Sequence, residues 1–263
     1  MDLGLKNKVA LVVASSRGLG RAVAEELAAE GASLLLCARD AEVLTETAAA
    51  IAETSGVHVL AVPADVTKID DIKRLVEAGI ERFGQIDILV TNAGGPPAGT
   101  FDQLTREQWD EAIRLTLLSA VELARQVLPG MKERRWGRII NITSIAVKQP
   151  VDGLLLSNSL RAGLTGFART LANEVAAEGI TVNNVMPGYT RTERLVELLE
   201  FLAQKQGITI DEVRATWEKE IPMARLGEPR ELAATIAFLA SERASYITGT
   251  SIQVDGGWIR SLL

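Results

Sequence analysis

The sequence is short of residues that bind metals or form cross-links. It contains one cysteine, Cys37, and one histidine, His58, in 263 residues. A single cysteine excludes an intrachain disulfide and fits a reducing compartment, and the two residues are too few for a zinc cluster. Because Cys37 lies in the apolar run 33–37, we expect it to be a small buried side chain.

Long hydrophobic runs and an excess of positive charge are also missing. The N-terminal residues lack the apolar core of a signal peptide, and no apolar run approaches the ~20 residues that span a bilayer. The net charge of −6 argues against a nucleic-acid surface, and we interpret the basic run 132–136 as the solvated end of a helix. We therefore expect a cytoplasmic protein that binds neither membranes nor nucleic acid.

Short apolar segments alternate with longer amphipathic ones along the chain. Patterns typical of buried parallel strands occupy 9–14, 33–38, 58–62, 86–91, 138–143, 181–186 and 251–254. Helical periodicity occupies 18–30, 40–54, 68–83, 105–133, 157–178 and 228–241. This alternation predicts an α/β fold with a single doubly wound Rossmann domain over 1–263, in which helices cover both faces of a seven-stranded parallel sheet.

The segment 192–225 departs from this alternation. It contains two short helical patterns and follows the sixth predicted strand. Ligands of open α/β folds bind beyond the carboxyl ends of the strands. The segment is therefore a candidate substrate lid within the single domain.

A glycine-containing turn joins the first predicted strand to the first helix. It reads Ala14-Ser15-Ser16-Arg17-Gly18-Leu19-Gly20. Glycines at such a turn let the backbone approach a pyrophosphate, and the helix N-terminus supplies N–H donors and a positive dipole end. The alternative is that Gly18 and Gly20 form an ordinary turn.

Motifs spread over the chain resemble those of short-chain dehydrogenases/reductases, and of 3-oxoacyl-acyl-carrier-protein reductases in particular. The resemblance covers essentially the whole chain. It rests on Ser16-Arg17-Gly18-Leu19-Gly20, Asp65-Val66-Thr67, Asn92-Ala93-Gly94, Ser144, Pro187-Gly188 with Thr192, and Asp255-Gly256-Gly257. It implies an NAD(P)(H)-dependent oxidoreductase that acts on a carbonyl or a secondary alcohol.

The resemblance also implies which residues hold the cofactor, from the pyrophosphate at the first turn to the nicotinamide carboxamide near the sixth strand. These residues are Ala14, Ser16, Arg17, Gly18, Leu19, Gly20, Arg39, Asp65, Val66, Asn92, Ala93, Gly94, Arg161, Pro187, Gly188 and Thr192. The turn departs from the family pattern at Ala14, where the family has glycine. If this position needs a positive φ, alanine costs on the order of 1 kcal/mol there.

The end of the second strand favours NADP(H) over NAD(H), although NAD(H) stays possible. NAD-binding proteins place an acid there, and a 2′-phosphate requires arginine instead. The resemblance puts Ala38 at the acid position, and Arg39 follows it. Arg39 and Arg17 could then clamp a 2′-phosphate. The alternative is a solvated Arg39 beside an Asp40 that caps the next helix.

The catalytic residues implied by the resemblance are largely replaced. Ser144 is present, but Ser157, Arg161 and Thr116 occupy the positions where the family has tyrosine, lysine and asparagine. Arginine keeps a fixed positive charge but is a poor member of a proton relay, and a serine hydroxyl without a base is a weak acid. Tyr189 and Lys148 are conceivable replacement donors and Asp152 a weaker one, although a packed tyrosine and a solvated lysine are the simpler interpretations.

Two functions stay open at this point. The first is a reductase or dehydrogenase with altered acid–base residues, and the second is a catalytically impaired nucleotide-binding regulatory or scaffold protein. The resemblance also implies a homodimer or homotetramer, with the fourth and fifth helices and the last strand as contact surfaces.

Overall fold

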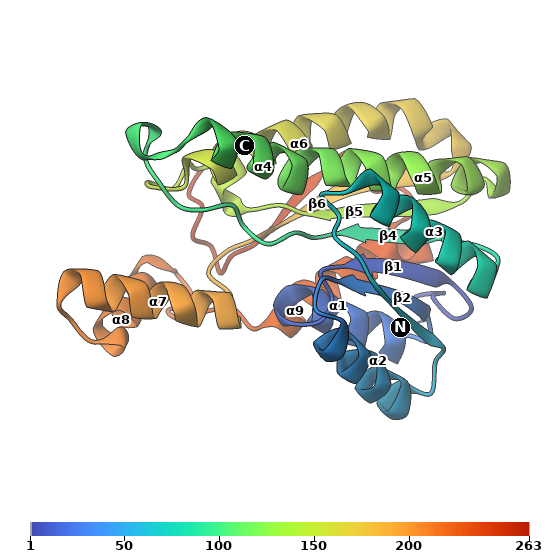
Figure 1. Cartoon of the computed structure of the whole chain (residues 1–263), viewed down its shortest axis with the longest axis horizontal. Helices are drawn as coiled ribbons and strands as arrows, with labels where there is room; N and C mark the ends of the chain where they lie inside the picture. Colours follow the sequence, from blue (N-terminus) through green and yellow to red (C-terminus); the bar gives the residue numbers. More distant parts are fainter. Residues whose placement is uncertain (1, 263) are drawn as a thin grey trace.

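The protein is built on one parallel sheet, as predicted (Figure 1). The structure is a computed structural model that describes residues 2–262, apart from the side chains of Arg194, Glu197, Phe201 and Lys205. The seven strands lie in the order β3-β2-β1-β4-β5-β6-β7. Their bounds are β1 Val9–Val13, β2 Ser33–Ala38, β3 Val59–Pro63, β4 Ile88–Thr91, β5 Gly137–Ile142, β6 Ile180–Pro187 and β7 Ser251–Val254.

The strand order reverses between β1 and β4. Chain-consecutive strands run outward from β1 to β3 on one side and from β4 to β7 on the other. At such a switch point the loops after the two central strands diverge, which leaves a crevice beyond their carboxyl ends. The fold therefore places the turn after β1 and the turn after β4 beside a natural ligand site.

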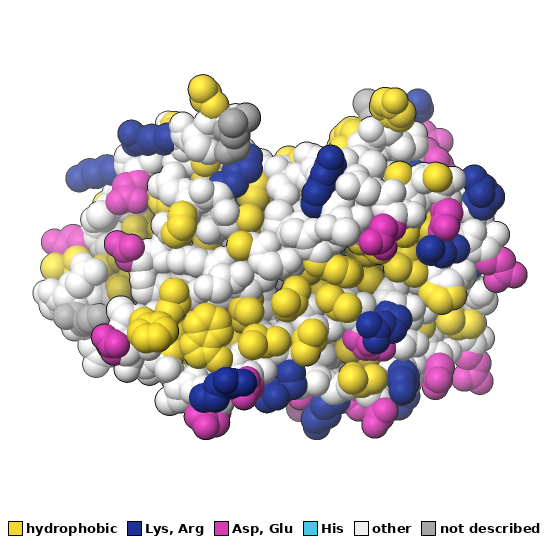
Figure 2. Space-filling model, turned by 90° about the horizontal axis from the view of Figure 1, so that it is seen from above, with side chains coloured by type: hydrophobic (Ala, Val, Ile, Leu, Met, Phe, Trp, Pro, Cys, Tyr) yellow, Lys and Arg dark blue, Asp and Glu magenta, His cyan; other side chains and the backbone are white. Residues whose placement is uncertain are grey.

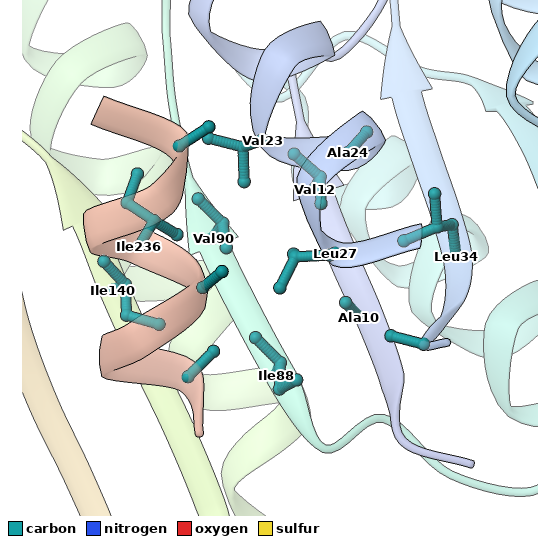
Figure 3. Packing of buried hydrophobic residues seen from close by; sticks show 14 of the residues in the cluster. Ala10, Val12, Val23, Ala24, Leu27, Leu34, Ile88, Val90, Ile140 and Ile236 are labelled. Atoms are coloured by element: carbon teal, nitrogen blue, oxygen red, sulfur yellow. The ribbon is translucent and has the colours of Figure 1, made fainter. Parts of the chain in front are cut away.

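Helices cover both faces of the sheet, and their bounds are α1 Gly18–Ala29, α2 Ala41–Ser55, α3 Ile69–Phe83, α4 Arg106–Ile113, α5 Ser119–Arg134, α6 Leu155–Val175, α7 Glu193–Gln206, α8 Ile210–Glu220 and α9 Pro229–Ala240. On one face, α1, α2 and α9 pack on the strands; Figure 3 shows Leu27 and Ile236 meeting Val12 and Val90. On the other face, α3, α5 and α6 bury the opposite side chains of the same strands. Both faces being buried explains why the strand sequences are continuously apolar.

The helix predicted over 105–133 is wrong as one continuous element. It begins with the expected capping box, in which the Thr105 backbone N–H donates to Gln108 Oε1 at 2.9 Å. A π-helical turn, Arg114–Leu118, then separates α4 from α5. Such a turn widens the backbone by one residue and is common beside functional sites. It carries Thr116, one of the predicted site residues.

The segment 192–225 folds into α7 and α8, which form an arm at one side of the molecule (Figure 1). The two helices bury a small apolar cluster of their own that includes Leu199, Ala203 and Val213. Figure 1 shows the arm extending away from the layered body, and Trp217 of α8 contacts that body by stacking on Tyr189. Among the described residues, no helix is long and apolar enough to cross a membrane.

Candidate functional site

The turn between β1 and α1 has the backbone geometry of a close-approach loop. Ala14 has φ 51° and Gly18 has φ 55°. The first value meets the condition under which alanine is strained at that position. Gly20 lies so close to the Ala14 carbonyl oxygen that a β-carbon at residue 20 would collide with it. Gly20 is therefore a packing requirement of the turn.

The N-terminus of α1 fits an anionic group. Over its described length no side chain caps α1, and its first turn contains no acidic residue. Its first N–H groups and the positive end of its dipole are therefore available to a phosphate. In contrast, α2, α7 and α8 each have a side-chain cap and an acid in the first turn. The residues of the turn thus fit the pyrophosphate of a dinucleotide.

Ser15 fixes this turn to the second strand, a role that the sequence did not indicate. Its side chain is fully buried, and Cys37 N–H donates to Ser15 Oγ at 3.1 Å while Ser15 N–H donates to the Cys37 carbonyl at 3.0 Å. Thr47 Oγ1 of α2 donates to the Ser16 carbonyl at 2.9 Å. The only available signal was the serine beside a glycine turn, which is too common to predict a contact.

Two arginines lie near the start of α1: Arg17 in the glycine turn and Arg39 directly after β2. Arg39 is exposed, and Arg17 lies 4.0 Å from the carboxylate of Asp40. Asp40 also caps α2, since its Oδ1 accepts from Val43 N–H at 3.2 Å. The capping role considered for Asp40 is confirmed, and the guanidinium groups of Arg17 and Arg39 both lie at the surface.

Asp65 and Val66 form the turn after β3. Asp65 Oδ1 accepts from Thr67 N–H at 3.0 Å and from Thr67 Oγ1 at 2.8 Å. Partial burial raises the pKa of the Asp65 carboxyl, but these hydrogen bonds, Lys68 and Arg39 outweigh it and hold the pKa below its usual value. Val66 is buried in the core under this turn, so the turn presents the Asp65 carboxylate above an apolar support.

Asn92 joins the two turns at the switch point. Its Nδ2 donates to the Ala14 carbonyl at 3.4 Å. Asn92 and Ala93 also line a small hollow together with Thr116 and Arg161. A β-carbon on Gly94 would meet nothing within 4 Å, so the chain after β4 borders open space. The structure thus brings together residues predicted from four separate motifs.

Thr116 contributes a buried hydroxyl to this hollow. The side chain is 3% exposed, and Thr116 Oγ1 has no hydrogen-bond partner within the described part of the chain. A buried hydroxyl without a partner is unfavourable by about 1–3 kcal/mol. The position therefore fits a polar atom of water or ligand in the hollow.

Ser144 follows β5, and the helix α6 that carries Ser157 and Arg161 contacts the end of this strand through Arg161. Ser144 is half-buried, and its Oγ accepts from Ala146 N–H at 3.1 Å at the start of the 3-10 turn Ile145–Val147. Ser157 lies one turn before Arg161 on the same face of α6. Arg161 is buried, and its Nη1 donates to the carbonyls of Ile142 and Thr143, the residues that precede Ser144.

The end of β6 meets the arm and the glycine turn. Pro187 is the last residue of β6, and a β-carbon on Gly188 would lie 2.7 Å from Asp255 Cα. Thr192 caps α7 by accepting from Leu195 N–H at 3.3 Å, and its methyl group lies 3.6 Å from where a β-carbon of Gly18 would be. The start of the arm therefore lies against the glycine turn at Gly18.

The three conceivable replacement donors lie in structural or exposed positions. Tyr189 stacks on Trp217 with a centroid separation of 4.6 Å, and burial followed by the charge of Glu220 raises its pKa. Lys148 Nζ lies 3.5 Å from Gln253 Oε1, and Asp152 is exposed in a turn. Tyr189 is thus a packed tyrosine that holds its proton more tightly than usual. No cluster of potential metal ligands occurs among residues 2–262 as described.

Known proteins of similar sequence include reductases. The family described as Enoyl-(Acyl carrier protein) reductase matches residues 13–259. The 3-oxoacyl-[acyl-carrier-protein] reductase FabG of Vibrio cholerae is 36% identical over 255 residues, which are 97% of this chain and 98% of that protein. The FabG reductase of Haemophilus influenzae is 38% identical over 253 residues, which are 96% of this chain and 98% of that protein.

Solved structures of similar fold include NADPH complexes. The L-sorbose reductase of Gluconobacter frateurii, complexed with NADPH and L-sorbose, matches with a TM-score of 0.96 and 38% identity over 100% of both chains. A variant of the actinorhodin polyketide ketoreductase with NADPH matches with a TM-score of 0.92 and 33% identity over 97% of this chain and 98% of that chain.

The switch point, the glycine turn and the open N-terminus of α1 define a dinucleotide-binding α/β protein. Within that class, the matches extend over nearly the whole chain. The chain belongs to the short-chain dehydrogenase/reductase family of NAD(P)-dependent oxidoreductases.

Proposed function

We propose that the chain is an NADP(H)-dependent oxidoreductase that acts on a carbonyl group or the corresponding secondary alcohol. The observation that carries this proposal is the open N-terminus of α1 below a turn with positive φ at Ala14 and Gly18, flanked by Arg17 and Arg39. An arginine pair suits the 2′-phosphate of NADP(H). The NADPH complexes of L-sorbose reductase and the polyketide ketoreductase support the same choice.

Each part of the crevice would hold one part of the dinucleotide. The N–H groups at the start of α1 would bind the pyrophosphate, Asp65 and Val66 would border the adenine, and Asn92 would border the adenosine ribose. Pro187, Gly188 and Thr192 would hold the carboxamide. When bound, NADPH supplies a hydride from its nicotinamide ring.

The substrate oxygen would be held by hydroxyl groups in place of a tyrosine. Ser144 would position the carbonyl, and Ser157, one helical turn from Arg161, would donate a second hydrogen bond. Arg161 keeps a positive charge near the reacting groups at every working pH. General acid–base catalysis contributes about 10²–10⁴-fold, so we expect turnover to be slower by this order than with an activated tyrosine.

A second candidate is a nucleotide-binding protein without turnover, which acts as a regulator or scaffold. It is favoured by the engagement of Arg161 Nη1 with two backbone carbonyls of β5, since this group is then not directed at a cofactor. It predicts tight NADPH binding in the absence of hydride transfer.

Fluorescence titration with NADPH and NADH, alongside NADPH oxidation over a panel of 3-oxoacyl thioesters, keto sugars and diketones, tests both candidates. We expect NADPH to bind more tightly than NADH. We expect Arg39→Ala to lower the affinity for NADPH about ten-fold and to leave the affinity for NADH unchanged. We also expect slow oxidation with at least one carbonyl. Tight binding without oxidation on any of them would support the second candidate, and absent binding would contradict both.

We also propose that the chain forms a homodimer or homotetramer. Figure 2 shows hydrophobic side chains gathered on the face that carries α4, α5 and α6. Phe101 and Leu118, on either side of α4, are 77% and 49% exposed. Exposed apolar patches of this kind often mark protein interfaces. Light scattering after size exclusion should give a multiple of 28.3 kDa, and a monomer would contradict the proposal.

A further inference from the structure

At the end of β5 the sheet loses one neighbouring strand, although Ile142 is still in register with Val185 of β6. β4 stops at Thr91, which is paired with Asn141, so Ile142 and Thr143 lie beyond the last β4 partner. On the other side of β5, the Thr143 N–H donates to the Val185 carbonyl of β6 at 2.9 Å. With no β4 partner here, a donor from outside the sheet can reach the carbonyls of Ile142 and Thr143, and buried carbonyls left unpaired are unfavourable.

Arg161 supplies that donor to both groups. Its Nη1 lies 2.9 Å from the Ile142 oxygen and 2.8 Å from the Thr143 oxygen, and its side chain is 9% exposed. Hydrogen bonds from a charged donor at these distances are among the stronger ones in proteins. A planar guanidinium also holds its donors in a fixed arrangement, unlike the rotating ammonium of lysine.

The bonded carbonyl of Thr143 belongs to the peptide group that joins Thr143 to Ser144. A peptide group is planar, so fixing its oxygen also fixes the direction in which the chain enters Ser144. On the far side, Ser144 Oγ accepts from Ala146 N–H at 3.1 Å. Ser144 is thus held between the Arg161 guanidinium and the 3-10 turn that follows it.

We propose that Arg161 is a positioning residue that sets the orientation of Ser144, rather than a ligand of the cofactor. The inference rests on the proposed oxidoreductase function, because Ser144 is the hydroxyl placed at the substrate oxygen. Arg161 then acts through the backbone of Thr143. The loss of its guanidinium therefore lowers the rate of the reaction without weakening cofactor binding.

The chain offers a matched control at the opposite end of the same strand. Arg138 is 2% exposed, and its guanidinium also donates to backbone carbonyls, those of Gly137 at 2.9 Å and Ser241 at 3.3 Å. Its removal perturbs a buried arginine on β5 far from Ser144. Arg138→Met therefore reports the general cost of losing such an arginine.

Hydrogen exchange of full-length Arg161→Met, Arg161→Lys and Arg138→Met, with NADPH titration and steady-state kinetics, tests the proposal. For Arg161→Met we expect exchange in 142–147 to be about ten-fold faster, kcat to fall about ten-fold or more, and the NADPH Kd to stay within about three-fold. Arg161→Lys should give intermediate exchange and an intermediate kcat, because an ammonium can still donate to a carbonyl. Arg138→Met should lower the unfolding temperature and leave exchange in 142–147 and kcat unchanged.

Two results would overturn the proposal. One is unchanged hydrogen exchange of residues 142–147 in Arg161→Met. If Arg161→Met does not fold, the corresponding result is a lowered kcat with unchanged exchange of residues 142–147 in Arg161→Lys. The other is a rise of about ten-fold or more in the NADPH Kd, which would place Arg161 on the cofactor. The exchange measurement needs no turnover, so it stays decisive even if no carbonyl is reduced and the oxidoreductase function itself fails.

Discussion

The Arg17 guanidinium of the glycine turn lies 3.8 Å from the carboxylate of Glu193, the first residue of α7. The same guanidinium lies 4.0 Å from the carboxylate of Asp40, which caps α2. Arg17 thus links the glycine turn to the arm and to the end of β2. A 2′-phosphate that bound Arg17 would therefore compete with the carboxylates of Asp40 and Glu193 for the same guanidinium.

Replacement of Glu193 by glutamine should therefore tighten NADPH binding. Removing one carboxylate lowers the repulsion of the 2′-phosphate and frees Arg17. Because both side chains are more than half exposed, the gain is limited to about two- to five-fold and should shrink at high salt. Titration with NADPH and NADH measures it, and NADH affinity should not change.

Glu25→Gln is the matched control for Glu193→Gln. Glu25 pairs with Arg21 on the exposed side of α1, with 2.8 Å between Oε1 and Nε. The control removes the same charge from a similar surface pair without touching Arg17. Equal effects of the two substitutions, or weaker NADPH binding in Glu193→Gln, would be inconsistent with competition for Arg17.

Gly20→Ala should abolish cofactor binding, with a loss of about 100-fold or more in NADPH affinity. The added β-carbon collides with the Ala14 carbonyl oxygen, so the turn must move away from the N-terminus of α1. The exposed helical Gly166 is the control, because a β-carbon there meets nothing within 4 Å. Gly166→Ala should raise stability by about 0.5–1 kcal/mol and leave binding unchanged. Retained NADPH binding in Gly20→Ala would contradict the geometry of the turn.

Alkaline pH should destabilise the protein through Cys37. Burial raises the pKa of the Cys37 thiol from 9.0 to about 12. The folded protein therefore keeps this proton where the unfolded chain loses it, so the stability it contributes is complete below pH 9 and is lost as the pH rises through 12. The slope between those limits is about 1.4 kcal/mol per pH unit.

Urea unfolding of the wild type and of Cys37→Ala at about pH 8 and about pH 10.5 measures this slope. The stability advantage of the wild type over Cys37→Ala should fall with rising pH. An advantage that grew or stayed constant would rule out a thiol that is protonated in the folded state. The same burial predicts that iodoacetamide alkylates Cys37 only on unfolding.

The layered fold could be predicted because the sheet is buried on both faces. β2 occupies the predicted 33–38, and β4 is shorter than predicted by two residues, since Ile86 and Asp87 precede the paired part of the strand. The break between α4 and α5 could not be predicted, because 105–133 has helical periodicity throughout. A π turn inserts one extra residue into the helix, which shifts the hydrophobic pattern too little to be seen in the sequence.

The candidate site could be predicted as a set of residues but not as a set of contacts. The glycine turn and Asn92 lie together as the motif order implies. The sequence placed Arg161 beside Ser157, yet it did not reveal that its Nη1 donates to the end of β5. Long side chains on a helix can reach several partners, and only the packed structure selects one. The contact of Glu193 with Arg17 could not be predicted for the same reason.

The most direct test of the account is NADPH oxidation by the double variant Ser157→Tyr/Arg161→Lys, compared with the wild type over the same carbonyl panel. A tyrosine beside a lysine restores a proton donor worth about 10²–10⁴-fold, which exceeds the roughly ten-fold loss expected from weakening the Arg161 bonds. We predict a net gain of about ten-fold or more with NADPH binding preserved. If the double variant binds NADPH but oxidises it no faster with any carbonyl, the account is contradicted. The site would then differ from that of an active reductase in more than its acid–base residues.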